Sequence, residues 1–553
     1  MAGLLRIMPV LTAYHIPLQA TPLVGYLLSC VVWMTGVMEV VGMEGSFEDF
    51  YSPKSVQKIH LSIDAADLRK MKEALPERIY VPATMRWRDL EIPNVGVRFK
   101  GDSSSQPQQT HKRSYLIKFS HYETDQRFLG MERVALDNGV QFGSLFSEPI
   151  VTEILRDLNI PASHCNHAQL FLNGEDHGVY VNVERIDESF LRRCFGSASG
   201  ALYKVHQPGP GANLAYAGPR LDDYKSCFSA KTEKAKEAYA DLVGLIQALG
   251  DGKNTPYEQV LGSQIVADDF LKTMAVMLLA GCFDQLTGWN PHNYYLYRHP
   301  MTQRWHYLPW DLDVGLADNA FGKIPVIEGW HAAWPIPGGP PKPILENIVN
   351  HPKLLASYRN NARSILARYF KPEHLKARLR KWYSLIEESL RTDPFPPRRA
   401  TNPEDTGYES ILDSIERFME KRYALAAAQL KDPGERPKTI PQGHHLQREP
   451  QPGTLPHAPS DLRILSRDAT SIELEWQVQT KEAVGHIVQR ALKAEPLMFH
   501  NHIPCPGPSQ SHAVDERIDP EATYLYRIYA VFPSPEGPVG SLPSEATESS
   551  PLN

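Results

Sequence analysis

The residues whose types and spacing could do chemistry lie in one stretch, between an apolar helical run and a pair of carboxylates. Asp284 opens a polar loop, Asn293 closes it, and Asp311 and Asp313 follow two short aromatic runs. Carboxylate and amide oxygens are ligands that Mg²⁺ accepts, and a separate carboxylate can orient a hydroxyl nucleophile. This order of loop carboxylate, amide and later carboxylate is what a phosphoryl-transfer site needs.

A helix and a hairpin must position these side chains. Apolar residues at helical spacing predict a helix over 268–280, and Gly281 ends it. Aromatic-rich runs over 294–298 and 304–308 surround a His-Pro-Met-Thr-Gln turn and predict a β-hairpin. The loop carboxylate then follows the helix, while the amide and the later carboxylates lie at the two ends of the hairpin.

Each of these residues also has a plainer interpretation. Asp284 is the candidate for orienting the acceptor hydroxyl, or it caps the preceding helix. Asp311 and Asp313 are candidate metal ligands, because like charges this close repel unless a cation offsets them; otherwise they are turn residues. Asn293 is the candidate metal-binding amide, with Asn290 as the weaker rival.

Protein kinases use the same order of loop, amide, hairpin and carboxylate, although the usual kinase signatures are missing. The sequence has no His-Arg-Asp, no Asp-Phe-Gly and no Gly-x-Gly-x-x-Gly. Its short motifs resemble those of the CotH family of atypical secreted protein kinases, which is named for a spore-coat protein. They occur in the family's order over about residues 55–370, and they are Val95–Ser104, Lys112–Phe119, Leu172–Gly174, Gly178–Tyr180, Glu184, Leu202–Lys204, His292–Tyr297 and Pro309–Asp313.

The resemblance implies an α+β fold, with an atypical two-lobed kinase-like domain over residues 46–430. It also implies ATP as donor, Mg²⁺ or Mn²⁺ as metal, and Ser or Thr hydroxyls of secreted or surface proteins, the protein itself included, as acceptors. Two other classes stay open. One is a catalytically inactive scaffold that keeps the fold, and the other is a carbohydrate- or envelope-binding protein, suggested by the aromatic residues.

Two lysines on predicted strands compete for the phosphates in the β-rich N-terminal lobe. Lys100 ends the strand region 78–100, and Lys118 lies in a strand over 115–119. The family's lysine-containing run favours Lys118 slightly, and the alternative for either residue is a surface lysine on an edge strand. The loop Gly101–Ser105 could cradle phosphate with its backbone N–H groups.

Two glutamates complete the predicted nucleotide site. A helix over 147–158 lies where a kinase pairs a glutamate with the phosphate lysine, and the family pattern points to Glu148 rather than Glu153. The alternative for Glu148 is compensation of the helix dipole. Glu184 follows a hairpin predicted around Asn173-Gly174, at the position of a kinase hinge, and is expected to contact adenine or ribose; otherwise it is an exposed charge.

Length, charge and cysteine usage narrow the remaining possibilities. A chain of 553 residues is too long for one core, so two or three domains are expected. The net charge of −6 gives no electrostatic argument for nucleic acid or an anionic membrane as partner. The six cysteines are scattered without a Cys-x-x-Cys pair, so no zinc site is expected. Further helices are predicted over 65–74, 231–249, 344–350, 353–370, 372–392 and 408–430.

The N-terminal segment 1–45 contains an apolar run, Leu23–Met38, which ends at Glu39. It is short for a membrane span and long enough for the apolar part of a signal peptide, and Cys30 lies in a sequence like a lipoprotein box. The run predicts export to the periplasm, the cell surface or the medium, with membrane anchoring at the N-terminus alone. A buried N-terminal helix or an upstream mis-assigned start is the alternative.

The C-terminal part is predicted to be a separate module. Residues 431–458 are rich in proline and read as a linker, and strands are predicted beyond them at the spacing of a β-sandwich. Residues 459–547 resemble a fibronectin type III domain, with Trp476 as the core tryptophan and Tyr524 as the tyrosine-corner residue. Such a module indicates adhesion or positioning rather than catalysis.

Overall fold

A computed structural model describes residues 45–551, with internal gaps at 102–104, 106, 108–111, 140–143, 251–255, 289–290, 319–325, 337–341, 398, 400–401, 403–404, 437–457, 494–498, 517, 533–538 and 542. The apolar run Leu23–Met38, Cys30 and Asn290 therefore lie outside the described residues, as do most of the Gly101–Ser105 loop and of the linker. Among the helices that are described, none is long and apolar enough to cross a membrane.

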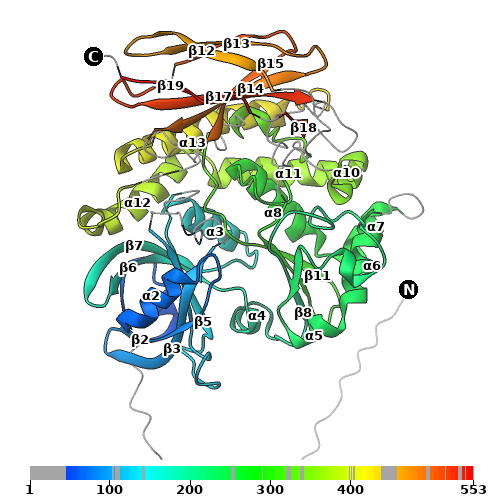
Figure 1. The fold of residues 1–553 in the computed structure, drawn as a ribbon. Coiled ribbons are helices and arrows are strands. Elements are labelled where there is room, and N and C mark those ends of the chain that lie inside the picture. The colour runs from blue at the N-terminus through cyan, green and yellow to red at the C-terminus, as the bar shows by residue number, and fades with distance from the viewer. Residues whose placement is uncertain are drawn as a thin grey trace, which may run out of the picture. The chain divides into compact units, whose positions relative to one another are not determined.

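The first part of the chain forms a closed β-barrel (Figure 1). The strand order around it is β1-β2-β3-β4-β5-β7-β6, and a parallel pairing of β1 with β6 closes the ring while the other pairings are antiparallel. The strands are β1 (Gln57–Ile63), β2 (Val81–Trp87), β3 (Leu90–Lys100), β4 (Ser114–Lys118), β5 (Arg133–Asp137), β6 (Cys165–Leu172) and β7 (Glu175–Glu184).

Alternating burial explains why these runs become barrel strands. Every second residue of β1 and β2 is buried, so one face of each strand fills the core and the other faces outward. Asn173 and Gly174 both have positive φ, as the predicted tight turn between β6 and β7 requires. Two short helices, α1 (Phe47–Phe50) and α2 (Ala65–Glu73), belong to the same part of the chain.

A second, antiparallel sheet has the strand order β11-β10-β8-β9. Its strands are β8 (Ala201–Val205), β9 (Phe228–Ala230), β10 (Tyr294–Arg298) and β11 (Trp305–Pro309), and α4 (Glu188–Phe195) precedes them. The hairpin predicted from the aromatic runs is confirmed, with Leu296 opposite Tyr307. The predicted helix over 231–249 is wrong in its extent. The structure has two helices there, α5 (Glu233–Glu237) and α6 (Tyr239–Gly250), which are separated at Ala238.

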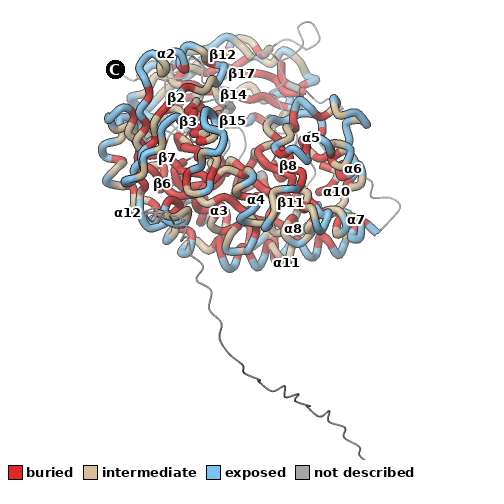
Figure 2. The backbone as a smooth tube through the Cα atoms, turned by 90° about the horizontal axis from the view of Figure 1, so that it is seen from below, coloured by how far each residue is buried: buried red, intermediate tan, exposed pale blue. Residues whose placement is uncertain are grey.

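Helices supply most of the remaining core. The predicted helix over 268–280 is confirmed as α8 (Ala267–Ala280), which is buried along most of its length and ends at Gly281 with φ of 71°. Arg422 donates hydrogen bonds to the carbonyls of Leu278 and Leu279 at that end. Figure 2 shows exposed turns on the outer side of α11 and α12. The other helices are α3 (Ser147–Asp157), α7 (Tyr257–Gln264), α9 (Val326–Gly329), α10 (Pro343–Asn350), α11 (Pro352–Tyr369), α12 (Pro372–Arg391) and α13 (Tyr408–Lys431).

The last part of the chain forms two further sheets that share one core. Trp476 and Tyr526 are buried in this core, and the Tyr524 hydroxyl accepts a hydrogen bond of 2.8 Å from the backbone N–H of Asp519. One sheet contains β12 (Ser460–Arg467), β13 (Ile472–Gln477) and β16 (His512–Asp515); the other contains β14 (Gly485–Leu492), β15 (His500–Pro506), β17 (Tyr524–Phe532), β18 (Val539–Gly540) and β19 (Thr547–Ser549). The predicted mixed α+β class is confirmed.

Candidate active site

The ladder between β3, β4 and β5 brings a lysine and an aspartate to one edge of the barrel. Lys100 at the end of β3 lies opposite Ser114, and Leu136 near the end of β5 lies opposite Tyr115. The next residue, Asp137, therefore comes close to Lys100, and its Oδ1 atom is 2.5 Å from the Lys100 Nζ atom. The same ammonium lies 3.8 Å from Oδ1 of Asp311.

Glu148 enters this group from the first turn of α3. Its side chain is buried, and its Oε1 atom accepts a hydrogen bond of 3.5 Å from the backbone N–H of Leu312. The preceding hydroxyl, Ser147 Oγ, donates to the carbonyl of Gly315 at 2.6 Å. The start of α3 is thus tied to the segment that follows β11, so Glu148 and the carboxylates of that segment are held together.

Gln285 fixes the two ends of the hairpin against each other. Its Nε2 atom donates to the carbonyl of Asn293, before β10, at 2.8 Å and to the carbonyl of Trp310, after β11, at 2.9 Å. The hydroxyl of Tyr307 donates to the Gln285 Oε1 atom at 3.0 Å. Asn293 and Asp311 both have positive φ, 55° and 61°, a backbone conformation that is uncommon for non-glycine residues and that Asn and Asp tolerate best.

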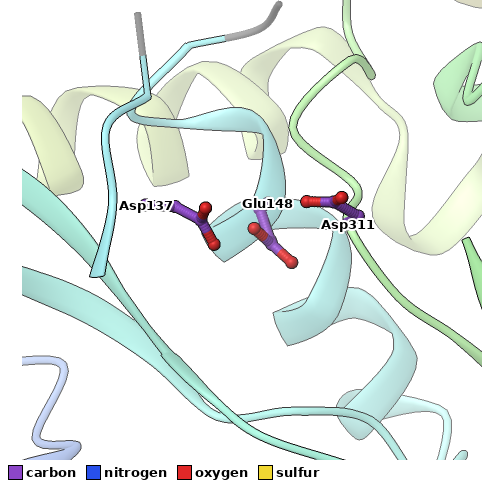
Figure 3. Close-up of side chains that lie close together, drawn as sticks. All are labelled: Asp137, Glu148 and Asp311. Carbon is purple, nitrogen blue, oxygen red and sulfur yellow. The ribbon is translucent and has the colours of Figure 1, made fainter. Parts of the chain in front are cut away.

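Asp137, Glu148 and Asp311 form a cluster in which each residue offers one oxygen, and these oxygens lie within 4.8 Å of one another (Figure 3). Two further oxygens of the cluster, Asp137 Oδ2 and Glu148 Oε2, are buried without a hydrogen-bond partner among the described residues. Buried carboxylates at this spacing repel one another, and a cation would relieve the repulsion. Asp313 lies near this cluster but is not a member of it.

The pKa values of these groups record the same crowding. Burial, with the nearby Asp137 and Asp311 carboxylates, raises the pKa of Glu148 well above its usual range. Burial and the Asp311 carboxylate likewise raise the pKa of Asp313. Burial also opposes the charge of Asp311, yet the ammonium groups of Lys100 and Lys204 outweigh it and lower its pKa. For Lys100, burial is outweighed by Asp137 and Asp311, so its pKa is raised.

Asp284 lies in the loop between α8 and β10, as predicted. Its Oδ2 atom is 4.0 Å from Nε2 of His292, and its carbonyl accepts a hydrogen bond of 2.9 Å from the His292 N–H. Its negative charge contributes to the raised pKa of Asp313, which places the two carboxylates in one neighbourhood. The residue that caps the C-terminus of α8 is Gly281 rather than Asp284.

A comparison with known families shows which family the chain belongs to. The family model described as "CotH kinase protein" matches residues 97–425 of the chain. The chain belongs to the CotH family. Inner spore coat protein H of Bacillus subtilis (strain 168) is 21% identical over 343 residues, which cover 61% of this chain and 88% of that protein. A solved structure titled "Myokine structure" is 19% identical, covers 18% of this chain and 100% of that chain, and has a TM-score of 0.16, a likeness too low to carry an argument.

Lys118 and Glu153 lie away from the cluster in this CotH-family chain. Lys118 is opposite Gly96, four residues along β3 from Lys100 or roughly 13 Å, and its ammonium is 3.5 Å from Glu132. Glu153 points to α12, where its Oε2 atom lies 2.9 Å from Arg378.

The Glu184 carboxylate has partners within the protein, and its expected contact with adenine or ribose stays a prediction. Arg193 donates to both of its carboxylate oxygens, at 2.9 and 2.6 Å, and the backbone N–H of His164 donates to Oε2 at 2.9 Å. Burial disfavours its charge, but the His164 hydrogen bond and the Arg193 guanidinium outweigh burial and lower the pKa of Glu184. The residue is buried, so the alternative of an exposed charge is wrong.

Sequence reasoning missed Asp137 and Gln285. Asp137 does have a local signal, because it ends the apolar run Val134-Ala135-Leu136 shortly before the helix that carries Glu148. Gln285 has none beyond its position next to Asp284, since its role depends on the distance between the two ends of the hairpin.

Proposed function

We propose that this CotH-family protein is an atypical protein kinase that transfers the γ-phosphate of ATP to Ser or Thr hydroxyls of exported or surface proteins, itself included. The observation that carries the proposal is the cluster of Asp137, Glu148 and Asp311, with two unpartnered buried oxygens, beside the ammonium of Lys100. A site of this charge pattern suits a metal–phosphate complex, in which the metal meets the carboxylates and the phosphates meet the lysine.

The donor set fits a hard divalent cation. Asp137, Glu148 and Asp311 offer oxygen ligands, and Asp313 and Asn293 are further candidates in the adjoining segments. Oxygen-only ligands favour Mg²⁺ or Mn²⁺ over zinc. When bound, such an ion would neutralise charge on the donor phosphates.

The chain's own residues then have distinct tasks. Lys100 is held by Asp137 in the manner of the lysine–carboxylate pair of kinases, and its raised pKa keeps it charged for phosphate binding. Asp284 is the group that we propose orients the acceptor hydroxyl. Gln285 positions both ends of the hairpin and so fixes Asp311 and Asn293 relative to that loop.

The architecture agrees with this assignment. We propose that the barrel is the N-terminal lobe and that the second sheet with its helices is the C-terminal lobe, with the cluster between them. The C-terminal sheets, with the buried Trp476 and the Tyr524 hydrogen bond, support a fibronectin type III-like module for positioning. The N-terminal apolar run supports export.

Transfer of radiolabel from ATP to the protein or to a generic acidic substrate tests the proposal. Asp311→Asn keeps the size of the side chain but removes a charge, so transfer should fall on the order of a hundredfold or more. Asp284→Asn should leave metal and ATP binding intact while transfer falls, because that carboxylate addresses the acceptor. A wild type that binds ATP and metal but labels no acceptor would favour the inactive scaffold.

A further inference from the structure

Beside the carboxylates, cationic side chains surround the indole ring of Trp310, the residue before Asp311. The Lys100 ammonium lies 5.6 Å from the ring centroid, the Arg185 guanidinium 4.4 Å and the Lys204 ammonium 6.0 Å. Lys100 already has Asp137 as its partner. Arg185 and Lys204 are therefore the cations whose presence needs another explanation.

These two cations come from different elements that the fold brings together. Arg185 directly follows β7, and its Nη2 atom donates a hydrogen bond of 3.2 Å to the Tyr295 hydroxyl. Lys204 lies on β8 opposite Tyr295 of β10, with its ammonium 5.8 Å from that ring. Barrel and second sheet thus each contribute one positive charge to the same aromatic pair, Tyr295 and Trp310.

Both cations keep donors that nothing in the described chain satisfies. The Nε atom of Arg185 is buried without a hydrogen-bond partner among the described residues. Lys204 is half-buried and has no hydrogen bond or ion pair with any residue that the structure describes. Burial, reinforced by Arg185, lowers the pKa of Lys204 to about 7, although the Asp311 carboxylate opposes this shift. For Arg185, Tyr295 and the carboxylates of Asp187, Asp137 and Asp311 outweigh burial and raise its pKa, so its unmet need is a hydrogen-bond acceptor. Buried donors without an acceptor cost stability, so their retention indicates a ligand.

Packing against tryptophan does not by itself account for them. Arg88 stacks on Trp87 at the same distance as Arg185 on Trp310, 4.4 Å. Its side chain is 45% exposed and lies 3.9 Å from the Asp49 carboxylate, so its charge stays solvated and partnered. The Trp310 site differs because two of its cations, Arg185 and Lys204, are enclosed and have donors without an acceptor among the described residues.

We propose that Arg185 and Lys204 form a polyphosphate-binding subsite that holds the donor phosphates at the Trp310 ring, beside the carboxylate cluster. The inference rests on the proposed function and deepens it, because it assigns phosphate recognition to charges on Trp310 and Tyr295 in a chain without a Gly-x-Gly-x-x-Gly loop. A planar guanidinium beside an ammonium matches neighbouring phosphate groups. The position next to Asp311 favours the donor over an acidic acceptor peptide, since the donor phosphates must reach that carboxylate.

Calorimetric titration of the full chain with inorganic tripolyphosphate, in EDTA, tests the subsite without metal or catalysis. The wild type should bind, and Lys204→Met and Arg185→Met should each weaken binding roughly tenfold or more. Arg88→Met is the matched control and should bind as wild type does. Because Lys204→Met removes an unpaired buried charge, its thermal unfolding midpoint without ligand should be equal to or above that of wild type.

Wild type that fails to bind tripolyphosphate, or variants that bind it as wild type does, would overturn the subsite. So would variants that lose affinity only for an acidic acceptor peptide. The two proposals fail separately. A protein that binds tripolyphosphate through Lys204 but transfers no phosphate keeps the subsite and loses the kinase assignment. If the wild type transfers phosphate but Lys204→Met binds tripolyphosphate as wild type does, the kinase assignment is kept and the subsite is lost.

Discussion

Two sites in the described part of the chain hold buried carboxylates in opposite ways. In the C-terminal sheets, Asp515 receives a hydrogen bond of 2.9 Å from Arg490 and one of 2.7 Å from the Tyr526 hydroxyl, and lies 2.8 Å from Nε2 of His502. In the cluster near the barrel edge, Asp137 and Glu148 are buried with oxygens that have no partner among the described residues.

Asp515 and Glu148 are both buried, yet their pKa values shift in opposite directions. Burial disfavours the charge of Asp515, but the His502 hydrogen bond and the charges of His502 and Arg490 outweigh it and lower the pKa of Asp515. Burial and like charges instead raise the pKa of Glu148. We call the Asp515 group closed, because its charge is paired within the protein, and the Asp137–Glu148–Asp311 cluster open, because two of its buried oxygens have no partner among the described residues. A closed group stabilises the fold, whereas an open one can gain partners from a ligand, and this difference is typical of structural and functional sites.

Glu148→Gln should have the largest effect, and on activity alone. The variant keeps the shape and the hydrogen bond to Leu312 but removes a charge that would face the metal, so phosphoryl transfer should fall on the order of a hundredfold. The unfolding free energy without ligand should change by less than about 1 kcal/mol, because the lost charge was not stabilising. Label transfer and urea unfolding on the same preparation measure both. A large loss of stability would mean that Glu148 is a structural residue.

Asp515→Asn should show the reverse behaviour. It leaves Arg490 and His502 buried without their counter-charge, which costs about 3–5 kcal/mol in comparable buried pairs. Urea unfolding of the full chain, followed by fluorescence in the transition that exposes Trp476, should report the loss. Nucleotide affinity should stay as in wild type, and a parallel fall in affinity would contradict the separation of the two sites.

Acid should weaken the closed group selectively. The pKa of Asp515 is lower in the folded protein than in the unfolded chain, so its contribution is fully present above about pH 4, the unfolded value. It is lost as the pH falls from there toward the folded pKa. Unfolding of the C-terminal sheets measured between pH 6 and 3 should show this loss in wild type and a shallower one in Asp515→Asn. Identical pH profiles would show that Asp515 carries no linkage.

The two candidate lysines give the smallest and sharpest contrast. Lys100→Met should weaken ATP binding by roughly tenfold, because it removes the ammonium next to Asp137 and Asp311. Lys118→Met should change affinity by less than about twofold, since its ammonium pairs with Glu132 near the surface. Titration of both variants with ATP decides the choice that the sequence left open. A larger loss of affinity in Lys118→Met than in Lys100→Met would place the phosphates at the other end of the β3–β4 ladder.

Local sequence patterns predicted much of the fold and the part of the site that lies at the hairpin. The aromatic runs specify β10 and β11, so the positions of Asn293 and Asp311 at the hairpin ends followed from short-range information. Lys100 and Lys118 could not be separated, because both lie on strands and only the register shows which one reaches the cluster.

The contacts that the sequence did not predict are those between residues far apart in the chain. The Glu184 carboxylate at the end of β7 is held by Arg193 from α4 and by His164 just before β6, and no spacing rule predicts both contacts. Asp137 comes close to Lys100 because β3, β4 and β5 pair side by side in the barrel. Arg185 and Lys204 meet only because the second sheet lies against the residue that follows β7.

Thermal unfolding of the full chain with ATP and Mg²⁺ or Mn²⁺, each added alone and then together, tests the central claim most directly. If the open carboxylates and Lys100 bind a metal–nucleotide complex, the two ligands together should stabilise wild type by about 2.7 kcal/mol at a hundred times the dissociation constant, far more than either alone. Glu148→Gln should lose this joint stabilisation and Asp515→Asn should keep it. A wild-type midpoint that does not move at millimolar ATP and metal, or one that moves equally in Glu148→Gln, would contradict the account.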